Sequence, residues 1–207
     1  YFRSLSMNRQ ASDMRALQVS LVNLGYVYYQ QSRFDEAREL FEEGVTLESQ
    51  TGQSAGATWA RVGRAQTDHR LGNERDAELQ LAFVIERQRA EDTGQLAAAL
   101  TAYAALLRGQ GRITEAEPLA REAVANRVAR DERALLTDSL SELAALAICA
   151  GTTAEGVTLA AAIAAQRNRI GYGLPDQERI IHQGFVDTAR ETLGARSFEQ
   201  AWSRGDR

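Results

Sequence analysis

Histidine and cysteine, the side chains that most often carry out catalysis or bind metals, are few and widely spaced in this chain. His69 and His182 are its two histidines, and Cys149 is its one cysteine. Metal sites need ligands at short spacings such as H-x-x-x-H or C-x-x-C, and neither spacing occurs. A cysteine nucleophile needs a neighbouring base, and no motif places a histidine beside Cys149. We therefore predict no catalytic residue and no metal ligand, and we interpret Cys149 as buried filler in an Ala-rich helix.

The other groups that could act on a substrate have the spacing of ordinary helix residues. No P-loop and no G-x-G-x-x-G pattern is present, so the sequence predicts no cofactor. The adjacent carboxylates Glu42 and Glu43 fall on a helix face that we expect to be exposed. Trp59 and Trp202 have helical spacings that favour packing over ligand stacking. Because these residues assemble no site, we expect that the protein is not an enzyme.

Composition and charge exclude several kinds of partner. The chain has 207 residues, of which 44% are hydrophobic and 25% charged, and its formal net charge is −4. Its 24 basic residues are all arginines interspersed with acidic residues, whereas a nucleic-acid binder usually gathers a basic excess on one face. No apolar run could span a membrane, no signal peptide opens the sequence, and a single cysteine fits a reducing compartment. We predict a cytoplasmic protein that binds neither nucleic acid nor membrane.

Any binding surface must be positioned by helices, and the sequence repeats one helix four times. A small residue recurs at intervals of about 40 positions, at Ala37, Ala77, Ala116 and Gly156. A turn former stands five positions before each of them, at Ser32, Gly72, Gly111 and Gly151. Such a period is the signature of stacked structural repeats.

A second helix precedes each of these and carries an apolar stripe at 3/4 spacing. The four stripes are Leu21, Leu24, Gly25 and Tyr28; Trp59, Val62 and Gly63; Leu100, Tyr103, Ala104 and Leu107; and Leu140, Leu143, Ala144 and Ala147. Gly63 precedes its small residue by 14 positions instead of the 12 of the other repeats. We therefore predict about two extra residues near His69.

This pattern resembles the tetratricopeptide repeat (TPR), whose two helices carry a large residue, Leu-Gly, an aromatic, and then Ala and Phe. The first repeat matches best, through Leu21, Leu24, Gly25, Tyr28, Ala37 and Phe41. The resemblance implies an all-α, right-handed superhelical solenoid of about four TPR-like helix pairs plus a C-terminal helical hairpin. The expected repeats occupy 11–50, 54–91, 95–129 and 131–169, within 11–170. We expect residues 1–10 to be the remnant of a preceding repeat, and 176–207 to be the capping hairpin.

The last 37 residues carry a second resemblance. The segment "GYGLPDQER", with "ARETLG" and "FEQAWSRG" after it, is similar to the end of bacterial multidomain signalling ATPases and transcription regulators. The residues that match are Leu174, Pro175, Glu178, Arg190, Leu193, Gly194, Phe198, Ala201, Trp202 and Gly205. The resemblance implies a repeat region that senses a partner or ligand and restrains a switch domain located elsewhere in the polypeptide.

Stacked helix pairs leave a concave groove lined by their first helices. The groove residues that we expect to bind are those outside the packing stripes: Asn23, Tyr26, Tyr29, Gln30, Gln66, His69, Arg70 and Arg108. Tyr and Arg often anchor interfaces, although Tyr26 and Tyr29 could equally cover the end of the array, and the two arginines could be solvated. We predict a non-catalytic interaction and sensor module for a protein, peptide or small effector. The alternative is a free-standing scaffold, and a homo-oligomer stays open.

Overall fold

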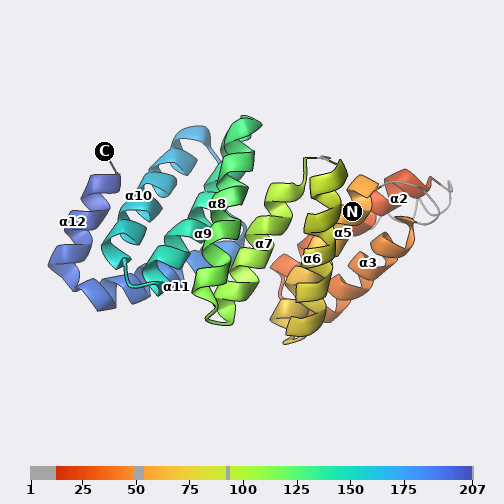
Figure 1. Ribbon diagram of the computed structural model, residues 1–207, viewed down its shortest axis with the longest axis horizontal. Helices are drawn as coiled ribbons and strands as arrows, with labels where there is room; N and C mark the ends of the chain where they lie inside the picture. Colours follow the sequence, from red (N-terminus) through yellow and green to blue (C-terminus); the bar gives the residue numbers. More distant parts are fainter. Residues whose placement is uncertain (1–12, 49–53, 92–93, 207) are drawn as a thin grey trace. The chain divides into compact units, whose positions relative to one another are not determined.

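The chain folds into α-helices joined by short turns (Figure 1). The computed structural model describes residues 13–48, 54–91 and 94–206, and in these ranges it contains ten helices and no strand. The all-α prediction is therefore confirmed for the described residues. Residues 1–10, the expected remnant of a preceding repeat, lie outside them. The chain divides into two compact units, Tyr1–Ala102 and Tyr103–Arg207.

The first unit contains two complete helix pairs. They are α2 (Met14–Gln30) with α3 (Phe34–Thr46), and α5 (Ser54–Arg70) with α6 (Glu74–Glu91). Helix α3 packs against both α2 and α5, and Phe41 from α3 is fully buried. A methyl group at Gly25 would lie 2.7 Å from the Phe41 ring, and one at Gly63 would lie 2.5 Å from it. The two glycines are thus what lets α2 and α5 approach the same aromatic ring.

The second unit begins within α7 (Leu96–Gly109). It continues with α8 (Ile113–Ala129), α9 (Arg133–Cys149), α10 (Thr153–Ile170), α11 (Asp176–Leu193) and α12 (Ala195–Gly205). Ala104 and Leu107 of α7 pack on Ala116 and Ala120 of α8. Helices α11 and α12 form the expected C-terminal hairpin, and Phe198 of α12 is buried in a cluster with Val157 of α10.

The turn inside each helix pair has three residues, and its middle residue has a positive φ. That residue is Ser32, Gly72, Gly111 or Gly151, with φ of 59°, 81°, 75° and 89° respectively. These are the four turn formers predicted from the sequence. In the first three turns the next backbone N–H bonds a carbonyl five residues earlier, as in Arg112 N to Leu107 O at 2.9 Å. This closure is the usual left-handed end of a helix, which favours glycine.

The register predicted for the second repeat is wrong. Its turn has the same length as the others, so no residue is inserted near His69. The small residue 12 positions before Ala77 is Ala65, which is fully buried. Gly63 matched the sequence pattern for another reason, because it accommodates Phe41 of the preceding pair.

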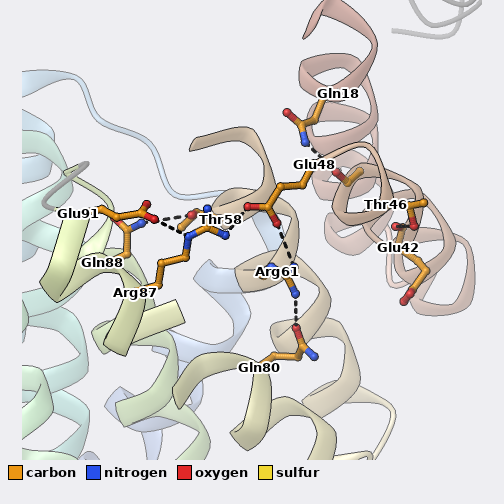
Figure 2. Close-up of polar contacts among 11 residues, drawn as sticks. Gln18, Glu42, Thr46, Glu48, Thr58, Arg61, Gln80, Arg87, Gln88 and Glu91 are labelled. Carbon is orange, nitrogen blue, oxygen red and sulfur yellow. Dashed lines mark hydrogen bonds and ion pairs between the residues drawn. The ribbon is translucent and has the colours of Figure 1, made fainter. Parts of the chain in front are cut away.

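With the corrected register, the stripe positions of the second repeat hold charged residues: Arg61, Arg64 and Asp68. Arg61 bonds Glu48 at 3.0 Å and Gln80 at 3.3 Å, and Arg87 also pairs with Glu48 (Figure 2). Arg61 therefore stands where the other repeats have an apolar residue, and it links α5 to Glu48 after α3 and to Gln80 of α6.

A second charged group in the same unit surrounds Asp68, whose side chain is fully buried. The Nε of Arg38 donates to its carboxylate at 2.6 Å, and Arg64 lies 3.5 Å from the other oxygen. Arg64 also pairs with Glu42 at 2.7 Å. A buried carboxylate is tolerated only with such partners, since desolvation penalises an isolated charge.

Position 156 holds glycine, whereas the other three repeats have alanine there, and the reason for the difference is steric. A methyl group at this position would lie 2.8 Å from Ala144 O and 2.7 Å from Ile148 Cγ1. Helices α9 and α10 approach so closely here that only glycine fits without a shift of the backbone.

Cys149 is exposed, so its interpretation as buried filler is wrong. It is the last residue of α9, where a helix end leaves one side open.

Trp59 and Trp202 do pack as expected, each half-buried against an apolar cluster. None of the described helices is long and apolar enough to cross a membrane.

Candidate binding site

Tyr26, Tyr29 and Arg70 lie in the first unit and are held by aromatic contacts. The ring of Tyr26 meets Phe41 edge-on with centroids 5.0 Å apart, and Tyr29 meets Phe34 in the same way at 5.6 Å. The Arg70 guanidinium lies over the Phe34 ring, 5.4 Å from its centroid. Phe34 therefore brings together Tyr29 from α2 and Arg70 from α5, and each of these two side chains keeps solvent access.

The polar residues expected in the same groove belong to the same two helices. Asn23 is exposed, and Gln30 and Gln66 are half-buried. The His69 ring lies 3.2 Å from Glu74 at the start of α6. We call the set of seven residues the tyrosine–arginine surface: Asn23, Tyr26, Tyr29, Gln30, Gln66, His69 and Arg70.

Arg108 lies in the second unit, and its guanidinium is already engaged. Its Nε and Nη2 donate to the two oxygens of Glu142, at 2.6 Å and 3.2 Å. The Phe185 ring covers the same guanidinium at 4.4 Å. Burial raises the pKa of Glu142, and the charge of Arg108 opposes that shift. Arg108 therefore neutralises a buried carboxylate, and this pairing could not be seen in the sequence.

Three arginines that were not singled out from the sequence recur at the repeat interval. Arg87, Arg127 and Arg167 are 40 positions apart, near the end of the second helix of successive pairs. Each makes an ion pair: Arg87 with Glu48 and Glu91, Arg127 with Glu132, and Arg167 with Asp138. The same periodicity that revealed the small residues could have revealed these arginines.

His182 of α11 is half-buried and, among the described residues, makes no side-chain hydrogen bond. Burial, together with the charges of Arg167 and Arg108, lowers its pKa to about 4. The imidazole is therefore neutral near pH 7.

The acid sensitivity of the second unit should depend on this histidine. The pKa of His182 is lower in the folded state than its ordinary value of 6.5, so its contribution to stability is full above pH 6.5 and is lost as the pH falls toward 4. We expect His182→Gln to reduce the loss of unfolding free energy between pH 7 and pH 4 by about 2–3 kcal/mol. Urea unfolding at both pH values measures this difference. Equal losses in the variant and the unmodified chain would contradict the assignment.

Comparison with known proteins agrees with the paired helices of the fold. The tetratricopeptide repeat family matches residues 16–90, and a second model of the same family matches residues 96–127. This chain contains tetratricopeptide repeats. Both the TPR resemblance and the all-α solenoid class predicted from the sequence are thus confirmed.

Solved structures support the TPR fold over a longer stretch. The nearly identical TPR-like repeats of a proposed kinesin light chain from Podosopora anserina align with a TM-score of 0.61 and 22% identity, over 90% of this chain and 92% of that one. A single-substitution variant of those repeats aligns with a TM-score of 0.60 at 22% identity, over 89% and 92%. At this identity the likeness shows the fold alone. No curated protein matches the chain.

Proposed function

We propose that this chain is a protein-interaction module that binds a partner protein or peptide through the tyrosine–arginine surface. The observation that carries the proposal is the Tyr29–Phe34–Arg70 cluster, within a fold whose first helices form extended binding surfaces. The aromatic contacts hold Tyr29 and Arg70 in place before any partner arrives, so little side-chain freedom is lost on binding.

The chemistry of this surface suits a mixed apolar and acidic segment. Tyr and Arg are enriched at interface positions where truncation costs the most binding energy. A partner side chain could pack on the partly exposed rings of Tyr26 and Tyr29, while a carboxylate approaches Arg70. Asn23 and Gln66 would add hydrogen bonds around this centre.

The double variant Tyr29→Ala/Arg70→Ala tests the proposal. We expect it to bind the partner at least about tenfold more weakly than the unmodified chain, because two anchoring side chains are removed. The partner is first captured from native cells by cross-linking, then purified and titrated by calorimetry. The double variant Arg75→Ala/Leu79→Ala is the matched control, since it removes an exposed arginine and an exposed apolar residue from α6. If both double variants bind equally well, the surface is misassigned.

We propose further that the module belongs to a cytoplasmic bacterial signalling or transcription regulator. The support is the resemblance of residues 171–205 to the end of multidomain signalling ATPases. In that setting, partner binding would bias an attached switch domain through its different affinity for the two states of the switch. A free-standing scaffold without regulatory output is the alternative. The complete open reading frame decides between them, since a nucleotide-binding or helix-turn-helix stretch in it would support the regulator.

A further inference from the structure

A pocket of about 280 Å³ lies in the second unit, among α9, α10, α11, α12 and the segment that joins α10 to α11. Its apolar wall includes Ile163, Val186 and Trp202. The Trp202 ring is held against the buried Phe198, with ring centroids 5.7 Å apart and planes 20° from parallel. This wall is therefore a fixed aromatic and aliphatic surface, and its volume suits a ligand smaller than most drugs.

The charged groups that line the pocket all have one sign. Arg167 and Arg179 contribute to the lining, whereas no aspartate or glutamate does. Arg179 is exposed and pairs with Asp176 at 2.5 Å, so Arg167 is the buried cation of the site. A pocket with this lining attracts an anion and disfavours a cation.

Arg167 lines this space, and its guanidinium is held in place by hydrogen bonds. Its side chain is 9% exposed, and three of its N–H groups are occupied by α9. Nε donates to Thr137 Oγ1 at 3.1 Å, while Nη2 donates to Thr137 O at 3.1 Å and to Asp138 Oδ1 at 2.8 Å. The two N–H groups of Nη1 make no hydrogen bond to the described residues. The bonds to α9 hold the guanidinium in place, so Nη1 can donate to a bound ligand instead of water.

The neighbouring carboxylate of Asp138 does not compete with a ligand for Nη1. The second oxygen of Asp138 already accepts from the Tyr172 hydroxyl at 2.9 Å. His182 lines the same pocket, has no hydrogen bond among the described residues, and is neutral near pH 7. Its N–H is available as a second donor beside Arg167.

We propose that this pocket binds a small organic monocarboxylate with an apolar body. The carboxylate accepts from Nη1 of Arg167 and from the imidazole of His182, and the apolar body packs on Trp202, Ile163 and Val186. Donors that are already fixed in place bind such a group without an ordering cost. The pocket contains none of the residues of the tyrosine–arginine surface. Ligand binding in the pocket and partner binding at that surface can therefore be tested independently.

Phenylacetate is the probe, and the histidines are the reporters. With two histidines in the chain, their imidazole signals can be followed by NMR in the unmodified protein. A carboxylate within about 4–6 Å should raise the pKa of His182 by about one unit or more, while His69 of the first unit should not respond. Phenylacetamide, which lacks the charge, should have no effect. An unchanged His182 at millimolar phenylacetate, or an equal response to the amide, would overturn the proposal.

Two alanines of α10 provide matched variants. Ala164 lines the pocket, whereas Ala162 is exposed on the same helix and does not. Ala164→Leu should fill the space and weaken phenylacetate binding at least about tenfold, and Ala162→Leu should change it by less than about twofold. Retained binding in Ala164→Leu would place the ligand elsewhere and overturn the site. Arg167→Ala is a poorer test, because it also removes three hydrogen bonds to α9.

Discussion

Arg108→Met should destabilise the second unit by about 3–5 kcal/mol, since it leaves a buried carboxylate without its charge partner. The side chain of Glu142 is 9% exposed, and both of its oxygens accept from Arg108. Methionine fills a similar volume but donates no hydrogen bond. The loss therefore reflects the unpaired Glu142 charge more than any cavity.

Fluorescence can follow this unit separately, because each unit contains one tryptophan, Trp59 or Trp202. In a Trp59→Phe background, urea unfolding monitored by Trp202 gives the free energy of unfolding. The double variant Arg108→Met/Glu142→Leu should recover most of the loss, as replacing a whole buried pair by apolar residues is often neutral. A double variant as unstable as Arg108→Met alone would show that Arg108 contributes by packing rather than by pairing.

The pH dependence of the same variant gives an independent check. Burial raises the pKa of Glu142, and losing Arg108 removes the one charge that opposes this shift. A carboxyl whose folded pKa is raised destabilises the fold progressively as the pH rises from its unfolded value of 4.5 through the folded value. The deficit of Arg108→Met should therefore be larger at pH 7 than at pH 4.5. A deficit that is equal at both would contradict the ionic explanation.

Phe41→Ala should cost the first unit about 3–5 kcal/mol, the usual range for a large buried aromatic. Phe41 is fully buried and in contact with both Gly25 and Gly63, so its removal empties the space between α2 and α5. The change is measured by urea unfolding followed through Trp59, which packs on the same cluster. Phe83→Ala is the control: Phe83 is 47% exposed, so the substitution should cost far less.

The glycine contacts predict a specific coupling with Phe41. Gly63→Ala alone should destabilise the unit, because the added methyl would lie 2.5 Å from the Phe41 ring. In the Phe41→Ala background the same methyl has room, and its cost should largely disappear. Additive effects of the two substitutions would mean that the ring and the glycine are not in the predicted contact.

The helices and turns that depend on local periodicity could be predicted from the sequence. The recurrence of Ala37, Ala77 and Ala116 located the second helices, and Gly72, Gly111 and Gly151 located the turns, because small residues suit a close crossing and glycine adopts a positive φ most easily. The register of the second repeat was misjudged for a physical reason. Gly63 meets a residue of the preceding pair, and a pattern within one repeat carries no information about such a contact.

The candidate sites were less predictable, because they depend on which side chains meet after packing. The sequence indicated Tyr29 and Arg70 by residue type and helix face, but not that Phe34 would join them. Arg108 has the same residue type as Arg70 and a similar helix position, yet its partner is 34 residues away. The pocket lined by Arg167 and His182 combines four helices, so no single segment of sequence contains its signature.

The charged contacts between α5 and the segment directly before it restrict how the repeats could be exchanged during evolution. Three residues of α5 pair with charged residues from the pair directly before it. Arg61 pairs with Glu48, Arg64 with Glu42, and Asp68 with Arg38. A duplicated or transplanted copy of the second pair would place these charges against a neighbour without the matching set, and would deprive the buried Asp68 of its bond from Arg38. We therefore expect the first two pairs to be inherited together and in their present order.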